Sequence, residues 1–202
     1  GAKEMNAMEI KVIQAMPEQR KPKPVDESKL GFGKHFSDHF FTMPYHSDRG
    51  WHDPLIEPYR PLQLDPTAMC LHYAQEIFEG MKAYRGKDGG IFMFRPMENI
   101  RRMNVSAERL CMPQLDENLF MEAITKLVLL DQAWIPRGSG TSVYIRPTMI
   151  ATEPALGVHA SPDYLFYILV GPVGAYYPEG FRPTKLFVEE HYVRSAPGGI
   201  VE

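Results

Sequence analysis

Tyr144 and Arg146, in the segment SVYIRP, place a phenol and a guanidinium two residues apart. In a strand, alternate side chains project from the same face, so these two groups would lie side by side. A guanidinium can bind both oxygens of a carboxylate, which suits a carboxylate-bearing ligand. A structural ion pair inside the sheet explains the spacing equally well, and the spacing alone does not separate the two interpretations.

Arg95 is a second candidate, because it ends the apolar run Ile91–Phe94 and directly precedes Pro96. Proline is favoured at the first position of a helix, so Arg95 is expected between a strand and a helix N-terminus. A cation at such a place can bind a phosphate group. Without further context, an exposed arginine at a strand end is the more common case.

Other familiar chemistry has little support in this sequence. His35 and His39 are four residues apart and would share a face, but no third ligand accompanies them, so a metal site is not favoured. There is no GxxxxGK[ST] loop, no GxGxxG helix start, no GxSxG turn and no paired CxxC. Cys70 and Cys111 stand in apolar contexts, which predicts small core residues and not a disulfide.

The composition is that of an ordinary globular protein. The 202 residues are 44% hydrophobic and 23% charged, enough for one domain or one and a fraction. The net charge is −3 and basic clusters are short, which argues against a nucleic-acid partner. No apolar run is long enough to cross a bilayer, and no secretory signal is visible. With unpaired cysteines, these features predict a cytoplasmic protein without membrane or nucleic-acid partners.

The elements that must position these side chains can be read from the hydrophobic periodicity. An aromatic stretch predicts a strand over about 34–45, and residues 74–81 have apolar side chains at helical spacing. GKDGG, residues 86–90, favours a tight hairpin. Helices are expected after Pro96 and over about 116–132. Two β-rich runs and a last strand at about 184–194 follow, so the sequence predicts an α+β fold with a mixed or antiparallel sheet.

Composition shifts along the chain suggest domain boundaries. Residues 1–30, rich in proline and charge, are expected to form a flexible arm, or a wrapping extension, outside the core. Residues 31–173 would form a small α+β domain. Residues 174–183 begin inside the segment GPVGAYYPEG, residues 171–180, and end three residues after it. The glycines and prolines of this segment are typical of an interdomain loop. Residues 184–202 would then be the first strand of an incomplete larger domain.

Six segments occur together in a familiar order and spacing: LHYAQEIFEGMKAYR, FRPMENIRRM, TSVYIRP, EPALGV, GPVGAYYPEG and VRSAPGG. Through them the chain resembles branched-chain amino acid aminotransferases, which are fold-type IV pyridoxal-phosphate enzymes. The resemblance implies the small N-terminal domain of such an enzyme and the start of its larger domain. It also implies pyridoxal 5'-phosphate as cofactor, reversible amino transfer between Leu, Ile or Val and 2-oxoglutarate or glutamate, and a homodimer.

The resemblance assigns roles to eight residues. Arg95 would hold the cofactor phosphate, and Arg194 would lie beside the cofactor. The implied substrate site consists of aromatic walls, a tyrosine and an arginine where the family recognises carboxylates, and a tyrosine of the interdomain loop: Phe32, Tyr73, Phe78, Tyr144, Arg146 and Tyr176.

The last residues depart from the family pattern. After VRSAPGG the family continues with threonine or valine, then glycine, two variable residues and the lysine that binds the cofactor. Here Ile200, Val201 and Glu202 follow, and in register the lysine would fall two residues beyond Glu202. Transamination needs that lysine as anchor and as base, so the resemblance implies that this chain alone is inactive.

Two alternatives to the branched-chain activity stay open. One is a catalytically inert fragment that acts only by dimerising or by binding a partner. The other is a relative of D-amino acid transaminases or aminodeoxychorismate lyase, which share the fold. The segments EPALGV and GAYYPEG favour the branched-chain group over the second alternative.

Overall fold

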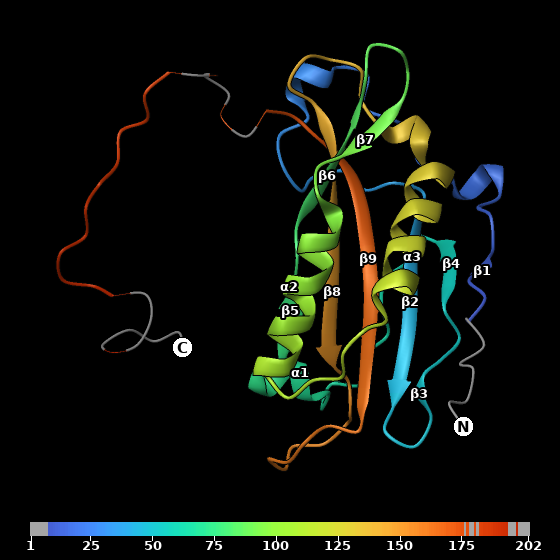
Figure 1. Cartoon of the computed structure of the whole chain (residues 1–202), viewed down its shortest axis with the longest axis vertical. Coiled ribbons are helices and arrows are strands. Elements are labelled where there is room, and N and C mark those ends of the chain that lie inside the picture. The colour runs from blue at the N-terminus through green and yellow to red at the C-terminus, as the bar shows by residue number, and fades with distance from the viewer. Residues whose placement is uncertain (1–7, 176, 178–179, 181, 194–196, 198–202) are drawn as a thin grey trace.

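The computed structural model describes residues 8–175, 177, 180, 182–193 and 197. Its body is a mixed sheet with two long helices packed over one face (Figure 1). The strands follow one another in the order β1-β4-β2-β9-β8-β6-β7, while β3 pairs with β2 and β5 pairs with β8. The pair β1–β4 is parallel and the other pairs are antiparallel. The α+β class expected from the sequence is confirmed.

The bounds of the elements are as follows. The strands are β1 Lys11–Val12, β2 His39–His46, β3 Gly50–Trp51, β4 Leu55–Pro58, β5 Glu76–Phe78, β6 Met81–Arg85, β7 Ile91–Met93, β8 Ser142–Ala151 and β9 Asp163–Val173. The helices are α1 Met69–Tyr73, α2 Pro96–Arg109 and α3 Glu117–Leu130, with short 3-10 turns η1 Pro17–Gln19, η2 Glu27–Lys29 and η3 Gln132–Trp134.

The core lies between the sheet and the helices α2 and α3. Each helix buries one apolar stripe, for example Ile100 and Met103 on α2 and Phe120 on α3. Phe166 of β9 is fully buried, and its ring contacts the rings of Phe41, Trp51 and Phe120. Aromatic packing of this kind joins neighbouring strands to the helix above them.

Three of the expected elements are confirmed, and their local chemistry explains them. Pro96 is the first residue of α2, as predicted. The helix α3 begins after Asp116, whose carboxylate accepts a hydrogen bond from the Leu119 amide at 2.7 Å and caps the first turn. The hairpin β6–β7 turns through Gly89, which has a φ of 84°.

Two periodicity predictions were wrong in detail. The helical spacing over 74–81 does not produce a helix, because α1 ends at Tyr73 and Ala74 takes a left-handed conformation with φ 51°. The residues that follow pair with β8 as β5, and backbone pairing with the sheet outweighs a short helical pattern. The strand expected from residue 34 begins later, at His39.

Of the two forms expected for the N-terminal residues, a flexible arm or a wrapping extension, the described part, residues 8–30, has the second and packs against the sheet. Ile10, Ala15 and Leu30 are buried, and β1 pairs with β4. The Ala15 amide donates to His39 Nε2 at 2.8 Å, and the Lys21 amide donates to Asp38 at 2.8 Å. A proline-rich and charged composition therefore describes an extension that wraps around the domain.

The strand expected at 184–194 is not found in residues 182–193, which form neither helix nor strand. This segment runs away from the sheet (Figure 1), and its apolar side chains, such as Phe187, are exposed. A strand requires a neighbour for its backbone groups, and no strand of the described sheet pairs with this segment.

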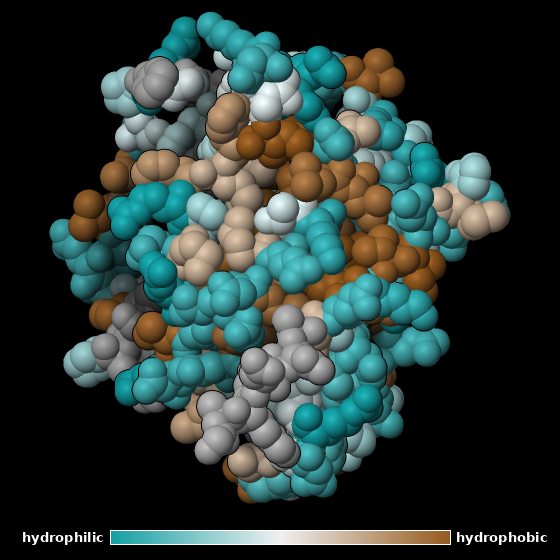
Figure 2. All heavy atoms as spheres, turned by 45° about the vertical axis from the view of Figure 1, so that its right-hand side comes forward, coloured by the Kyte–Doolittle hydropathy of each residue, from teal (hydrophilic) through white to brown (hydrophobic). Residues whose placement is uncertain are grey.

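Apolar side chains also show as patches among hydrophilic groups on the face seen in Figure 2.

Candidate functional site

Tyr144 and Arg146 lie together on one face of β8, as the alternation predicted. The Arg146 guanidinium donates from Nε and Nη2 to the Tyr144 hydroxyl oxygen, at 3.1 and 2.9 Å. No carboxylate of the described residues forms an ion pair with Arg146, so the alternative of a structural ion pair finds no partner there. The remaining N–H groups of Arg146 are available to an acidic ligand.

Two further aromatic side chains complete this group. The Phe32 ring meets the Tyr144 ring edge-on at 4.8 Å between centroids. The Arg146 guanidinium lies 4.3 Å from the centre of the Phe78 ring, as a cation–π contact. We call Phe32, Phe78, Tyr144 and Arg146 the carboxylate cluster, after the ligand group that the arginine could bind; none of the four is itself an acid. Phe32 and Phe78 are both about half exposed, so the cluster presents apolar walls beside a cation.

The space behind the carboxylate cluster is too small for a substrate. Tyr144 and Arg146 line a cavity of about 20 Å³ together with Val170 and Gly171. That volume holds one water molecule at most. A ligand of the cluster must therefore bind on its open side, against the exposed faces of Phe32 and Phe78.

Gly80 is a residue of this site that the sequence analysis missed. A Cβ atom at Gly80 would overlap the hydroxyl oxygen of Tyr144, so only glycine lets the tyrosine lie where it does. Gly80 stands between Glu79 and Met81, and the apolar spacing over 74–81 indicated a helix, so nothing in the sequence marked this glycine as a place where another group approaches the backbone closely.

Glu79, also missed, is a buried acid beside Gly80. Its carboxylate accepts two hydrogen bonds from Arg102, at 2.5 and 2.8 Å, one from Asn99 at 3.1 Å and one from the Gly80 amide at 3.2 Å. Burial alone would raise the pKa of Glu79, but these hydrogen bonds outweigh burial and hold that pKa below its ordinary value. The carboxylate is therefore ionised at neutral pH.

Arg95 lies at the N-cap of α2, between β7 and the helix, as the sequence predicted. Its φ is 46°, a left-handed conformation that is uncommon outside glycine. The guanidinium is 69% exposed and lies 3.8 Å from Glu98. Pro96 has no N–H and the Glu98 amide donates to the Arg95 carbonyl at 3.1 Å, so the cation and the Met97 amide are the groups that could bind an anion at this helix N-terminus.

The remaining expected site residues are more scattered. Tyr73 ends α1, and its hydroxyl donates to the carbonyl of Leu156, so it is bonded to the EPALGV segment and not to the carboxylate cluster. Tyr176 and Arg194 lie outside the described residues. Their predicted roles stay predictions.

The histidines and cysteines have structural surroundings. His39 is buried, and its Nδ1 lies 2.7 Å from Asp131. No group of three or more His, Cys, Asp or Glu side chains with metal-site geometry occurs in the described part of the chain. Both cysteines are free, and Cys111 is exposed, contrary to the core position expected for it. Its loop carries it outward with a left-handed φ of 53°.

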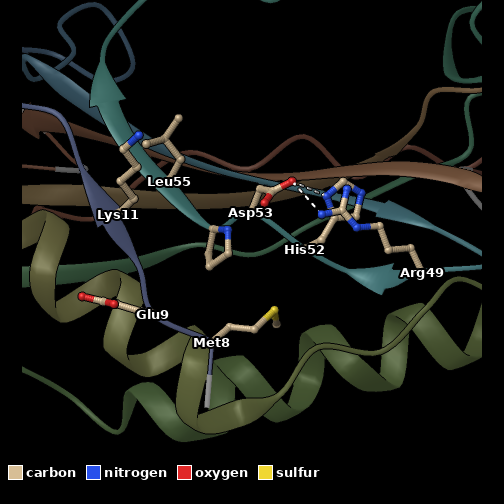
Figure 3. Close-up of a pocket in the computed structure, with 8 residues that line it drawn as sticks. Met8, Glu9, Lys11, Arg49, His52, Asp53 and Leu55 are labelled. Carbon is tan, nitrogen blue, oxygen red and sulfur yellow. Dashed lines mark hydrogen bonds and ion pairs between the residues drawn. The ribbon is translucent and has the colours of Figure 1, made fainter. Parts of the chain in front are cut away.

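A larger groove, of about 570 Å³, opens at the β1–β4 edge (Figure 3). Lys11 and Leu55 line it, together with Asp53, Arg49 and His52. Asp53 is already paired with His52 at 2.8 Å and with Arg49 at 3.4 Å. In the sheet order β2 and β9 separate this edge from β8, so the groove is remote from the carboxylate cluster.

No protein-family model matches the chain. Among solved structures, a branched-chain amino acid aminotransferase of T.th. with pyridoxamine 5'-phosphate superposes with a TM-score of 0.51, covering 66% of this chain and 40% of that one at 25% identity. An Escherichia coli branched-chain amino acid aminotransferase gives a TM-score of 0.50 at 20% identity, covering 68% of this chain and 41% of that one. The described domain therefore has the fold of the N-terminal domain of fold-type IV aminotransferases.

Proteins of similar sequence show which family within this fold class the chain resembles. "Branched-chain-amino-acid aminotransferase 2" of Bacillus subtilis is 52% identical over 180 residues, which are 89% of this chain and 49% of the relative. A cytosolic branched-chain-amino-acid aminotransferase of Caenorhabditis elegans is 44% identical over 95% of this chain and 46% of the relative. The chain is thus a homologue of the branched-chain-amino-acid aminotransferases, as its motifs indicated, and it spans about half the length of these curated relatives.

Proposed function

We propose that this chain forms the substrate- and phosphate-binding small domain of a branched-chain amino acid aminotransferase. The reaction would be reversible amino transfer between leucine, isoleucine or valine and 2-oxoglutarate. The carboxylate cluster carries this proposal, because its arginine has no acidic partner among the described residues and lies against the rings of Phe78 and Tyr144, with Phe32 packed on Tyr144. The homology to branched-chain aminotransferases supports the same activity.

The carboxylate cluster suits two unlike substrates. A branched aliphatic side chain would pack against the rings of Phe32 and Phe78, where apolar contact provides the binding energy. The second carboxylate of glutamate or 2-oxoglutarate would instead bind the free N–H groups of Arg146, with Tyr144 holding the guanidinium in place. A pocket with an apolar wall and one cation can accept both in turn.

Arg95 and the Met97 amide at the start of α2 fit the phosphate of pyridoxal 5'-phosphate, the proposed cofactor. The cation is exposed, and its unusual φ sets it at the helix N-terminus where a phosphate is favoured. When bound, this cofactor supplies the electron-withdrawing ring on which amino transfer depends. We propose in addition that Arg194 lies beside the cofactor and that Tyr73 and Tyr176 border the substrate.

Equilibrium binding tests the proposal on this chain directly. Titration calorimetry would compare 2-oxoglutarate with 4-methyl-2-oxopentanoate, the keto acid of leucine, for the wild type, Arg146→Met and a matched surface control, Arg109→Met. We expect R146M to weaken 2-oxoglutarate by about tenfold to a hundredfold, since a hydrogen-bonded charge contributes about 1.5–3 kcal/mol. The keto acid of leucine should change by less than about threefold. Equal losses for both ligands, or no binding by the wild type, would contradict the proposal.

The transfer reaction is tested separately with L-leucine, 2-oxoglutarate and pyridoxal 5'-phosphate, and with D-alanine in place of leucine. Glutamate formed from L-leucine supports the branched-chain activity. Glutamate formed only from D-alanine supports a D-amino acid transaminase. Ligand binding without transfer from either donor is the result expected for this chain alone, because the expected lysine falls beyond Glu202, and it agrees equally with a binding domain without catalysis.

We also propose a homodimer in the cytoplasm. The family resemblance implies the dimer, and the apolar side chains exposed on the domain give it surface to bury (Figure 2). A relative named as cytosolic supports the compartment. No helix among the described residues is long and apolar enough to cross a membrane. Sedimentation equilibrium at a mass near 23.1 kDa would contradict the dimer.

A further inference from the structure

Glu79 lies in the two-residue break between β5 and β6, which pair with β8 one after the other in the same direction, and it is directly beside the carboxylate cluster. Its side chain is 5% exposed, although it is charged. An ionised carboxylate is expensive to bury and persists only where several donors satisfy it. The donors around Glu79 therefore show what the residue holds together.

One set of donors comes from α2. Arg102 binds both carboxylate oxygens of Glu79, and Asn99, one helical turn earlier, donates to Oε2. Arg102 is 67% exposed, so a surface residue of the helix binds an acid that is buried below it. These bonds fix the helix relative to the break between β5 and β6.

The other contacts lead to the carboxylate cluster. Glu79 Oε2 accepts from the Gly80 amide, and the Asn99 side chain also donates to the Gly80 carbonyl at 3.1 Å. Both ends of Gly80 are thus held, and the hydroxyl of Tyr144 rests against this glycine. The Glu79 amide donates to the carbonyl of Pro147 on β8, the residue after Arg146.

The helix that Glu79 holds is also the helix that presents Arg95. Arg95 is the N-cap of α2, and Asn99 and Arg102 lie in its first two turns. We propose that Glu79 is a positioning residue that fixes the separation between the phosphate site at Arg95 and the carboxylate site at Tyr144 and Arg146. This inference rests on the proposed function, because it takes both half-sites as given.

A ligand that occupies both half-sites at once is the probe that this inference requires. N-(5'-phosphopyridoxyl)-L-glutamate joins a phosphate to a dicarboxylate through a stable linkage. Its affinity depends on the separation of the two half-sites, whereas inorganic phosphate and 2-oxoglutarate each report on one half-site. In catalysis, misplacing reacting groups by about 1 Å can reduce the rate by about a hundredfold. The affinity of a linked ligand depends on the separation of its two binding sites in the same way.

The experiment measures dissociation constants of these three ligands for the wild type, Glu79→Gln and the control Glu122→Gln. Glu122 is an exposed acid on α3, and among the described residues it pairs with Lys126 along the same helix. Glutamine keeps the size of Glu79 but cannot accept the paired donors of Arg102 with both oxygens. We expect E79Q to weaken the linked ligand at least about tenfold and each separate ligand by less than about threefold, with E122Q unchanged.

Asn99→Ala provides a second variant in case E79Q does not fold, because Asn99 is only partly buried. It should show the same selective loss for the linked ligand, to a smaller degree. Wild-type affinity for the linked ligand in both variants would overturn the inference and leave the proposed function intact. Equal losses for all three ligands would also overturn it, because they would indicate general destabilisation. Failure of the wild type to bind any of the three would instead refute the proposed function.

Discussion

Replacing His39 by leucine should destabilise the domain and release its N-terminal extension. The Ala15 amide donates to Nε2 of His39, so Nε2 carries the lone pair and Nδ1 carries the proton that is donated to Asp131. The His39 and Asp131 side chains are 5% and 3% exposed. Leucine would fill the space but would satisfy neither neighbour.

The size of the effect follows from the two groups that lose their partners. A buried amide without an acceptor costs about 1–3 kcal/mol, and a hydrogen bond to a charged group contributes about 1.5–3 kcal/mol. Asp131 keeps one bond, from the His39 amide at 2.9 Å, which limits the loss. Apolar burial of leucine offsets a further part. We expect the free energy of unfolding to fall by about 2–4 kcal/mol.

Urea unfolding at pH 7, followed by circular dichroism, measures this loss, and hydrogen exchange of residues 10–20 shows whether the extension is released. The control is His159→Leu, since His159 is about half exposed and pairs only with Glu153. A substitution at such an exposed position changes the free energy of unfolding by no more than about 0.5 kcal/mol. A loss no larger than the control, or unchanged protection of the Ala15 amide, would refute the reasoning.

Three further predictions concern the core, a close backbone approach and pH. Phe166→Ala should lower the free energy of unfolding by about 3–5 kcal/mol in the same urea assay, because it empties the centre of an aromatic cluster. Gly171→Ala should cost at least about 1–3 kcal/mol, since its Cβ would overlap the backbone carbonyl of His35; a neutral result would contradict that packing. The lowered pKa of Glu79 implies stabilisation that is full above its ordinary value of 4.5 and is lost as pH falls through the lowered pKa, so E79Q should flatten the acid limb of a stability–pH profile.

Much of the fold could be predicted because local signals and tertiary packing agree there. Pro96 and Asp116 mark the starts of α2 and α3, and Gly89 allows the hairpin turn, all within a few residues. The pair Tyr144 and Arg146 could also be predicted, because alternation along a strand is a strict geometric rule. In these cases neighbouring residues contain the whole physical reason.

The errors arise where distant partners decide the structure. The composition of the extension left a flexible arm and a wrapping extension equally open, because the residues that hold it, His39 and Asp38, lie far along the chain. The apparent helix at 74–81 gives way to pairing with β8, whose sequence lies some seventy residues later. Glu79 and Gly80 gave no recognisable motif of their own, since their importance comes from contacts with α2 and Tyr144.

The way the sheet ends at its two sides affects how the domain behaves in a concentrated solution. The strand order begins with β1, which is two residues long, and ends with β7, which is three residues long, so these two are edge strands. A long bare edge would offer its unpaired amides and carbonyls to another chain, and edges this short offer very few. β1 also covers β4, which would otherwise provide a four-residue edge. The wrapped extension therefore guards the domain against edge-to-edge self-association, and releasing it would create a surface for aggregation.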